Sequence, residues 1–409
     1  MTTAADIATD LLTPLGAYLG LRGQGRGAFL LESVDRGRLG RFSFVGCGSR
    51  LCTLAEAEAA GEPVVGYLAY DHVARLEPTV PLPDEGPELP ESCFVVADVL
   101  LRFDHVGGVA EVLRGDPGAV GELLAAPPGP VAVTPTRPDR TRRFPTRARY
   151  EAAVRRAKEH IRAGDAFQIV VSQRAERPTS ASAVALYRAL RRINPSPYLF
   201  LLELEDLALV GSSPETLVKL EGRRASVNPI AGTTSPGIGD AERLLASEKD
   251  RAEHVMLVDL GRNDLSRVCI PGTVRVERFL EAERFSHVTH LVSEVVGELR
   301  EGVVPFDLLR ACFPAGTVSG APKVRAMQII SELEGYRRGP YAGAVGYSIP
   351  GTGFDTCIAI RTIVLAGGVA HLQAGAGIVA DSDPTAEHEE CLRKLAALET
   401  AITLAETER

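Results

Sequence analysis

Strand-like apolar runs alternate with amphipathic helical stretches along most of this chain, and this order most constrains its fold. An amphipathic helix is expected at residues 149–163, closed by Gly164 and Asp165. Strand-like runs follow at residues 167–172, 199–203, 356–363 and 369–374, joined partly by hairpin-like turns and partly by helices. Composition and order predict an α+β or mixed α/β fold, and they leave the order of the strands open.

The chain is expected to consist of two parts and a connector. Residues 1–114 mix strand-like runs (27–31, 42–45 and 64–68) with alanine-rich helical stretches. Residues 115–145 are rich in proline and glycine, which suits an exposed connector. Residues 146–409 would then form the second and larger part, the catalytic domain. A chain of 409 residues is long enough to bury a large core.

The composition excludes several classes of protein. The apolar share of 45% and the charged share of 24% are ordinary for a soluble globular protein. A net charge of −8 favours neither nucleic acid nor an anionic membrane as a partner. The seven cysteines lack paired spacing, which indicates reduced thiols and a cytoplasmic location. No apolar run is long enough to span a bilayer, and the N-terminus lacks the features of a signal peptide.

Acidic residues in two helical segments form a candidate metal site. Glu387, Glu390 and Lys394 recur at i, i+3 and i+7, which places them on one helical face. Glu253 lies in a second helical segment, with the sequence DRAEHVMLVDL. Carboxylates that face one cleft repel each other unless a cation lies between them, and oxygen-only ligation favours Mg²⁺. An isolated E-x-x-E pattern, however, more often marks a solvated helix face.

Other candidate residues have structural alternatives. Arg361 lies amid apolar neighbours in a strand-like run, where it needs an anionic partner unless its head reaches solvent. Gly375 and Gly377 allow a close backbone approach to a ligand, although glycines in a strand also mark bulges. Glu215 follows Ser-Pro and could simply start a helix, and His290 lies in an apolar stretch that suits a core histidine.

Five motifs taken together resemble the chorismate-utilising enzymes, and within them the large subunits (component I) of anthranilate synthases. The motifs are NPIAGT (228–233), SPE (213–215), RAEH (251–254), FPAGTVSGAPK (313–323) and DSDPTAEHEE (381–390). The resemblance implies two large, mostly antiparallel sheets packed as a sandwich, with helices outside and the active site in the cleft. It covers nearly all of the second part, and weaker matches extend into the first.

The resemblance also assigns roles to individual residues. It implies metal ligands at Glu253 and Glu390, with Glu387 as a supporting carboxylate. It implies a general acid at Glu215 and a histidine, His290, that promotes the elimination of pyruvate. The remaining residues are expected to contact the substrate: Gly232, Thr233, Thr317, Tyr341, Arg361, Gly375, Gly377 and Lys394.

Two positions bear on which nucleophile attacks chorismate. Gln168 stands where the water-adding branch of the family has a basic lysine, and glutamine cannot deprotonate water. Ala231 stands where aminodeoxychorismate synthases commonly carry a lysine nucleophile. The resemblance therefore favours ammonia as the nucleophile, in a Mg²⁺-dependent lyase that makes anthranilate in tryptophan biosynthesis. The loop after Thr233 departs from the family's usual R-P-R-G and reads TSPG, followed by a shorter linker.

Alternatives within the family are a synthase that stops at 2-amino-2-deoxyisochorismate and an aminodeoxychorismate synthase. An alternative of another class is a non-catalytic sensor, which would not need Glu215. The chain has no cysteine in a nucleophile-elbow context, so a separate glutamine amidotransferase subunit would supply the ammonia.

Two segments resemble the halves of a tryptophan feedback site. The first contains Leu31, Glu32 and Ser33, and the second contains Asn194, Pro195, Pro197 and Tyr198. Tryptophan is therefore expected as an effector.

Overall fold

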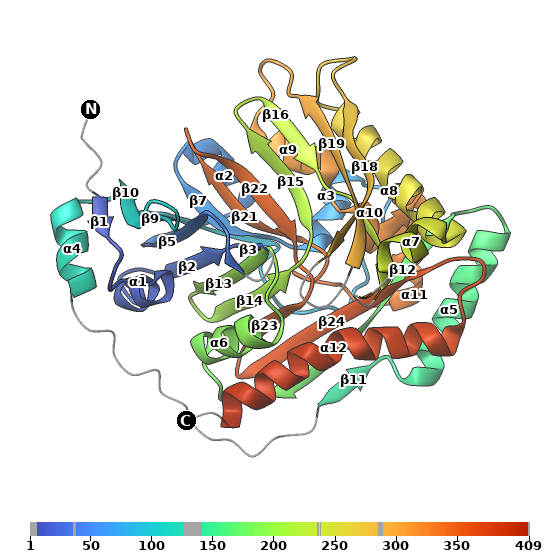
Figure 1. The fold of residues 1–409 in the computed structure, drawn as a ribbon. Coiled ribbons are helices and arrows are strands. Elements are labelled where there is room, and N and C mark those ends of the chain that lie inside the picture. The colour runs from blue at the N-terminus through green and yellow to red at the C-terminus, as the bar shows by residue number, and fades with distance from the viewer. Residues whose placement is uncertain are drawn as a thin grey trace.

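Two large antiparallel sheets form the framework of the molecule (Figure 1). The structure is a computed structural model that describes residues 6–35, 38–125, 141–234, 237, 239–284 and 289–407. The larger sheet has 12 strands in the order β1-β10-β9-β5-β2-β13-β14-β23-β24-β12-β11, with β20 paired to β12. The smaller sheet has 10 strands in the order β17-β19-β16-β15-β22-β21-β7-β8-β6, with β18 paired to β19.

Both sheets combine strands from the first and second parts of the chain. The larger sheet contains β1 (Asp6–Ala8), β2 (Gly27–Glu32), β5 (Phe42–Gly48), β9 (Val99–Asp104), β10 (Val109–Arg114), β11 (Arg142–Phe144), β12 (Gln168–Pro178), β13 (Tyr198–Leu204), β14 (Leu207–Ser213), β20 (Gly320–Ala321), β23 (Thr362–Ala366) and β24 (Val369–Ile378). The smaller sheet contains β6 (Arg50–Cys52), β7 (Val64–Leu68), β8 (Ser92–Val96), β15 (Thr216–Glu221), β16 (Arg224–Val227), β17 (Ile230–Thr234), β18 (Arg275–Arg284), β19 (Thr289–Glu298), β21 (Ala344–Ile349) and β22 (Gly353–Ile358). A separate hairpin pairs β3 (Val34–Asp35) with β4 (Arg38–Leu39).

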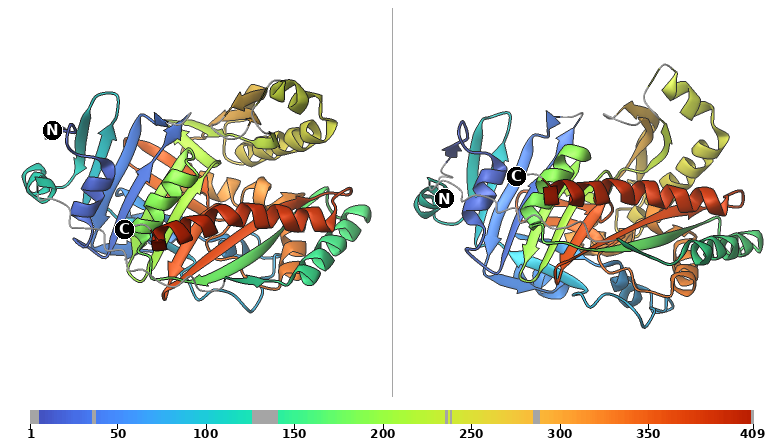
Figure 2. Two further views of the ribbon diagram at one scale, coloured as in Figure 1. Left: turned by 60° about the horizontal axis from the view of Figure 1, so that its bottom comes forward. Right: turned by 90° about the horizontal axis from the view of Figure 1, so that it is seen from below.

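The helices lie around the two sheets (Figure 2). They are α1 (Pro14–Leu21), α2 (Leu54–Ala60), the 3₁₀ helix η1 (Tyr70–His72), α3 (Val73–Leu76), α4 (Pro117–Ala125), α5 (Arg147–Arg162), α6 (Ala183–Ile193), α7 (Asp240–Ala246), α8 (Glu248–Ser266), α9 (Pro305–Cys312), α10 (Gly316–Ser319), α11 (Lys323–Glu334) and α12 (Pro384–Thr407). No helix among the described residues is long and apolar enough to cross a membrane.

The side chains of β13 explain why the sheets form a sandwich. Phe200 and Leu202 point into a buried cluster with side chains of the smaller sheet, including Val65 and Val345. Their neighbours Leu199 and Leu201 belong to the cluster under α6 and α12 on the opposite face. Because successive strand residues face opposite sides, both faces of β13 are buried and its sequence is apolar throughout. The fold expected from the family resemblance is confirmed.

Strands from residues 1–114 complete both sheets. In the larger sheet β2 pairs with β13, and Leu31 lies opposite Phe200. In the smaller sheet β7 pairs with β21, and Tyr67 lies opposite Val345. The two parts of the sequence therefore share both sheets. The expected connector contains α4 and β11, and its residues 126–140 lie outside the described residues.

The expected continuous strand over residues 356–363 is wrong. The chain ends β22 at Ile358 in the smaller sheet and begins β23 at Thr362 in the larger sheet. Arg361 has a φ of 50°, which is the left-handed region and breaks an extended chain. The candidate arginine therefore lies at the crossing between the sheets and not within a strand. The expected helix at 149–163 is confirmed and begins two residues earlier, where Thr146 caps it.

Candidate active site

Glu253 of α8 and the acidic face of α12 come together at the cleft, across from the start of β12. Gln168, the first residue of β12, donates from Nε2 to Oε1 of Glu253 at 3.1 Å. Burial raises the pKa of Glu253, and the negative charge of Glu390 raises it further. Burial also raises the pKa of Glu387, again with a contribution from Glu390. These carboxylates are therefore close enough to disfavour one another's ionised forms.

The donor set at this place consists of carboxylate oxygens. Burial is the main cause of the raised pKa of Glu253, and a divalent cation would offset the added repulsion from Glu390. Within the described ranges, no three His, Cys, Asp or Glu side chains gather closely enough to hold a metal ion by themselves. The arrangement thus fits an ion that takes one or two protein carboxylates and completes its shell with water and substrate oxygens. Chorismate-binding enzymes use metal cofactors in general.

Lys394 ties the acidic helix face to the neighbouring strand. Its Nζ lies 2.8 Å from Oε1 of Glu390, one turn earlier in α12. The same Nζ donates to the carbonyl oxygen of Gly375 in β24 at 2.8 Å. Lys394 therefore places a positive charge between the candidate metal ligands and the glycine strand.

Glu215 lies in the turn between β14 and β15, so the helix start that its sequence also allowed is not present. Its carbonyl oxygen accepts the N–H of Ile358 at 3.0 Å. Burial raises the pKa of Glu215 to about 8, against the opposing effects of the Thr317 hydroxyl, Arg361 and Lys394. At neutral pH this carboxyl is mostly protonated, so it can donate a proton.

Arg361 supplies a half-buried positive charge beside this acid. Burial lowers its pKa, and the Glu215 carboxyl opposes that change. Its guanidinium forms no hydrogen bond or ion pair with any residue in the described part of the chain, whereas the fully buried Arg338 is paired. A half-buried guanidinium without a partner among these residues suits an anionic ligand.

Gly375 and Gly377 keep space beside two candidate side chains. A Cβ at Gly375 would lie 2.8 Å from the hydroxyl oxygen of Tyr341. A Cβ at Gly377 would lie 2.3 Å from Nε2 of Gln168. The glycines therefore let the Tyr341 hydroxyl and the Gln168 amide approach the backbone of β24.

His290 and Gly232 meet on adjacent strands. Nδ1 of His290 lies 2.9 Å from the carbonyl oxygen of Gly232. A carbonyl oxygen only accepts, so Nδ1 carries the hydrogen and the lone pair of the neutral ring lies on Nε2. Burial lowers the pKa of His290, as does the charge of Arg361, while the Gly232 carbonyl opposes them. Thr233 follows Gly232 in β17 and lies opposite His290.

Thr317 lies on the short helix α10, next to Glu215. The two residues line one pocket that extends along α8 toward Asp264. The Thr317 hydroxyl is near enough to Glu215 to oppose the rise in its pKa. The pair does not meet ordinary hydrogen-bond geometry, however, and Oγ1 of Thr317 is buried without a partner in the described structure. Its hydroxyl can therefore contact a ligand.

The structure brings the two expected effector segments together, away from the carboxylate cluster. Glu32 of β2 lies opposite Leu199 of β13, and Leu31 lies one residue earlier in the same pairing. Glu32 is buried, accepts from the Tyr187 hydroxyl and lies 3.4 Å from Arg191. Ser33 follows β2 directly.

The second segment connects to residues of the active site. Asn194 caps α6, and its carbonyl oxygen accepts from Ser212 Oγ. Pro195 and Pro197 lead from it into β13. The hydroxyl of Tyr198 lies 2.7 Å from Thr216 Oγ1, next to Glu215, and 3.0 Å from Asp355 Oδ1. Burial raises the pKa of Asp355 to about 6.

Two functional features were not evident from the sequence. Gln168 counted there only against a basic lysine, whereas in the structure it also bonds Glu253. The buried pair Glu334 and Arg338, which lies behind Tyr341, had no sequence signal that marked it. Neither has a periodicity or spacing signal, and only the position of Arg338 three residues before Tyr341 could have pointed to it. His287 lies outside the described residues.

Comparisons with known proteins agree with this geometry. A family model described as chorismate binding enzyme matches residues 46–400. Anthranilate synthase component 1 of Thermus thermophilus is 44% identical, and the match covers 97% of this chain and 96% of that protein. The corresponding Streptomyces coelicolor protein is also 44% identical, with 97% of this chain and 88% of that protein covered.

Solved structures share the fold along nearly the whole chain. Anthranilate synthase component I from Streptococcus pneumoniae is 33% identical with a TM-score of 0.79, and the match covers 96% of this chain and 99% of that one. The menaquinone-specific isochorismate synthase of Escherichia coli has a TM-score of 0.78 at 22% identity over 98% and 94% of the two chains, a likeness of fold alone. The chain belongs to the chorismate-binding enzyme family.

Proposed function

We propose that this chain is the synthase subunit of an anthranilate synthase, which converts chorismate and ammonia to anthranilate and pyruvate. The observation that carries the proposal is Glu215, a half-buried carboxyl whose pKa burial raises to about 8. It lies beside the guanidinium of Arg361, which has no hydrogen-bond or ion-pair partner among the described residues. The relatives that match nearly the full chain at 40–44% identity are named anthranilate synthase component 1 or its probable equivalent.

Chorismate carries two carboxylates, and we assign them to different groups of residues. Arg361 and the Tyr341 hydroxyl would bind the enolpyruvyl carboxylate, with the N–H groups near Gly375 and Gly377 close by. Glu253 and Glu390, supported by Glu387, would hold a Mg²⁺ ion, and Lys394 would lie beside it. When bound, Mg²⁺ supplies a positive charge that fixes the ring carboxylate and neutralises the acidic cluster.

In the first step ammonia adds at C2 of the ring while the C4 hydroxyl leaves. Hydroxide is a poor leaving group, so Glu215 donates its proton and the group departs as water. The product is 2-amino-2-deoxyisochorismate. Ala231 offers no amine to compete with ammonia, and Gln168 offers no base to activate water.

In the second step the C2 proton and pyruvate are lost, and the ring becomes aromatic. His290 is the group assigned to promote this elimination, because its neutral ring carries a lone pair on Nε2. Burial and the charge of Arg361 lower its pKa, which keeps the ring neutral near physiological pH.

The proposal also includes tryptophan as an effector and a partner subunit that supplies ammonia. Ammonia would come from a separate glutamine amidotransferase subunit, as the word component in the relatives' names suggests. Tryptophan would act as a feedback inhibitor at the segments around Glu32 and Tyr198, which pair across β2 and β13.

A product assay tests the proposal. The purified chain is incubated with chorismate, Mg²⁺ and ammonium at mildly alkaline pH, and the products are identified. Anthranilate and pyruvate in equal amounts are expected, and chelation of the metal with EDTA should abolish both until Mg²⁺ is restored. An amino-diene without pyruvate would instead identify a 2-amino-2-deoxyisochorismate synthase, and 4-aminobenzoate after addition of a lyase would identify an aminodeoxychorismate synthase.

A further inference from the structure

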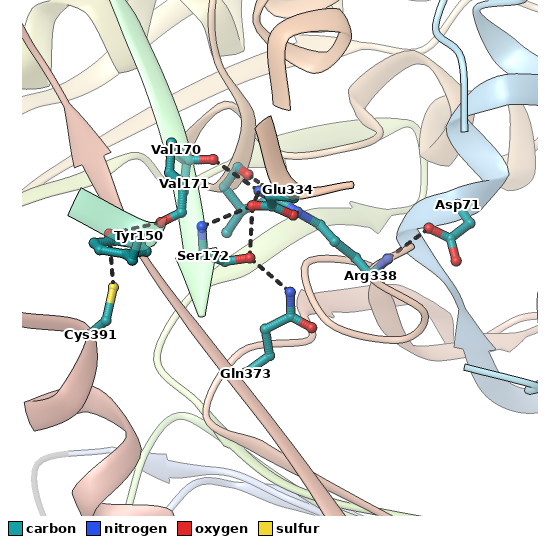
Figure 3. A network of polar contacts seen from close by, with 10 residues as sticks. Asp71, Tyr150, Val170, Val171, Ser172, Glu334, Arg338, Gln373 and Cys391 are labelled. Atoms are coloured by element: carbon teal, nitrogen blue, oxygen red, sulfur yellow. Dashed lines mark hydrogen bonds and ion pairs between the residues drawn. The ribbon is translucent and has the colours of Figure 1, made fainter. Parts of the chain in front are cut away.

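The outer edge of β12 is paired at both ends and open in between. The strand β20 pairs with Gln168 and Ile169, and β11 pairs with residues 174–176. Between these contacts, side chains bond the backbone. Arg338 Nη2 donates to the carbonyl oxygen of Val170 at 2.9 Å, and Glu334 Oε1 accepts the N–H of Ser172 at 2.8 Å (Figure 3). The side chains of Glu334 and Arg338 thus form the hydrogen bonds that a neighbouring strand would otherwise make with this edge of β12.

Glu334 and Arg338 are both buried, with side-chain exposures of 6% and 1%. Glu334 is the last residue of α11, and Gly335 then turns the chain with a φ of 60°. The carboxylate accepts from Nη2 at 2.6 Å and from Nε at 2.9 Å, which is a two-pronged contact. A buried ion pair offsets its desolvation cost only when geometry is good and the remaining donors are satisfied.

The remaining donor of Arg338, Nη1, reaches the short helix α10 that carries Thr317. Nη1 donates to the carbonyl oxygen of Val318 at 2.7 Å. The guanidinium also lies 4.6 Å from the ring centre of Tyr70 and 5.6 Å from that of Tyr341. Every arm of the guanidinium therefore has a partner.

The backbone at Arg338 is held from the first part of the chain. Asp71 of η1 accepts the N–H of Arg338 and the N–H of Gly339, each at 3.0 Å. Tyr70 in turn donates its N–H to the carbonyl oxygen of Gly339 at 2.8 Å. The arginine is thus anchored at its backbone before its side chain enters the interior.

Through these contacts one ion pair joins the pieces of backbone that carry the candidate substrate residues. Val318 is adjacent to Thr317. Val170 and Ser172 lie directly opposite Gly377 and Gly375 in β24, and these are the two glycines of the site. The hydroxyl of Ser172 also bonds both Glu334 and Gln373.

The metal end of the site has different support. Glu253 is held by Gln168, and Glu390 by Lys394. Neither carboxylate forms a hydrogen bond or ion pair with Glu334 or Arg338 in the described structure. The pair therefore contacts only one end of the cleft directly, and its link to Glu390 runs through Gly375 and Lys394.

We propose that Glu334 and Arg338 are positioning residues, which hold Thr317, Tyr341 and the Gly375 backbone at the spacing that binds the enolpyruvyl carboxylate. The inference rests on the proposed function, because it assigns that end of chorismate to these groups. Disturbing the pair should weaken chorismate binding and leave Mg²⁺ activation nearly unchanged.

Two variants test the inference. Glu334→Met with Arg338→Met removes the pair as a unit, so no lone charge remains buried. Arg338→Lys keeps the charge but loses the fork of donors. For both we expect the KM for chorismate to rise about tenfold or more, because small displacements at a site are costly. The Mg²⁺ concentration for half-maximal activity should change less than about twofold by the same reasoning.

A matched control separates positioning from stability. Arg177 and Glu406 form another buried ion pair, with exposures of 6% and 2%, between β12 and α12. Arg177→Met with Glu406→Met should lower the melting temperature as the test pair does and leave the KM for chorismate unchanged. Combining Arg338→Lys with Thr317→Val should raise KM by less than the product of the single effects, since one acts through the other.

The outcomes distinguish this inference from the proposed function. A wild-type chain that does not turn over chorismate would refute the function itself. With an active wild type, an unchanged KM in Arg338→Lys would overturn the inference, as would an equal rise in KM for the Arg177 and Glu406 control. If the double methionine variant fails to fold, Arg338→Lys decides alone.

Discussion

Burial, more than any neighbouring charge, sets the chemistry of Glu215. Arg361 and Lys394 both favour its ionised form, yet its pKa still rises to about 8. The same enclosure lowers the pKa of Arg361, and it leaves that guanidinium without a protein partner in the described chain. The low polarity of the cleft thus has two effects. It keeps the Glu215 carboxyl protonated, and it makes the Arg361 guanidinium a favourable site for an anion.

Replacing Glu215 with glutamine should remove the proton donor without changing its shape. We expect kcat to fall about 100- to 10,000-fold, the usual contribution of a general acid, with little change in KM. Glu221→Gln, at an exposed carboxylate at the far end of the following strand β15, should leave kcat unchanged. A glutamine variant with wild-type turnover would contradict the assignment.

The pH profile follows from the same carboxyl. The acid works only when protonated, so activity is present below its pKa and lost as the pH rises through about 8. Measured at a constant concentration of NH₃, kcat/KM of the wild type should decline above this pH. The residual activity of Glu215→Gln should lack that decline.

At the scale of elements, the strand β24 contributes to the site through two glycines, which have no side chains. Gly375 and Gly377 project no side chain toward the cleft, and Tyr341 and Gln168 occupy the space that a Cβ would take. The nearest atoms are the far ends of side chains, although the carbonyl oxygen of Val171 also lies 3.1 Å from a Cβ at Gly375. A substitution here should therefore disturb the site more than the fold.

Gly375→Ala and Gly377→Ala should lower kcat/KM on the order of tenfold to 100-fold while the melting temperature changes little. The displaced groups are the Tyr341 hydroxyl, 2.8 Å from the new Cβ, and the Gln168 amide, 2.3 Å from it. Gly121→Ala in α4 is the control, because its Cβ meets nothing within 4 Å. Full activity in both variants would show that the glycines are only structural.

At the scale of the whole molecule, both sheets depend on residues 1–114. Without β2 and β7, the edges of β13 and β21 would lose their pairing. The cluster between the sheets would also lose Phe29 and Val65. The division of the sequence into two parts therefore does not correspond to two separate sheets.

A fragment of residues 146–409 should fail to fold cooperatively. Urea unfolding of both chains is measured by far-ultraviolet circular dichroism. We expect the full chain to unfold in one cooperative transition and the fragment to show no sharp transition. The physical reason is that strand edges would be exposed and that the core would lose the buried side chains of residues 1–114. A fragment with a cooperative transition of its own would show that the second part is an independent domain.

The effector segments allow a separate prediction. Tryptophan should inhibit anthranilate formation, and its binding can be followed by its own fluorescence because the chain contains no tryptophan. Tyr198→Phe should bind tryptophan but respond less, since the lost hydroxyl connects β13 to Thr216 beside Glu215. Activity that is unchanged at millimolar tryptophan would contradict the prediction.

The sequence by itself determined many of the elements and the family. Local patterns were sufficient for the helix α5, the apolar strand β13 and the shared face of Glu387, Glu390 and Lys394, because periodicity depends only on neighbouring residues. The motifs likewise led to the family that the comparisons show.

Only the tertiary structure decided how these parts act on one another. Arg361 was expected within a strand, and its left-handed backbone at the crossing between the sheets became visible only in three dimensions. The raised pKa of Glu215 and the ion pair of Glu334 and Arg338 also depend on distant segments that close around them. Burial and long-range contact are properties of the folded chain, so no local pattern of residues encodes them.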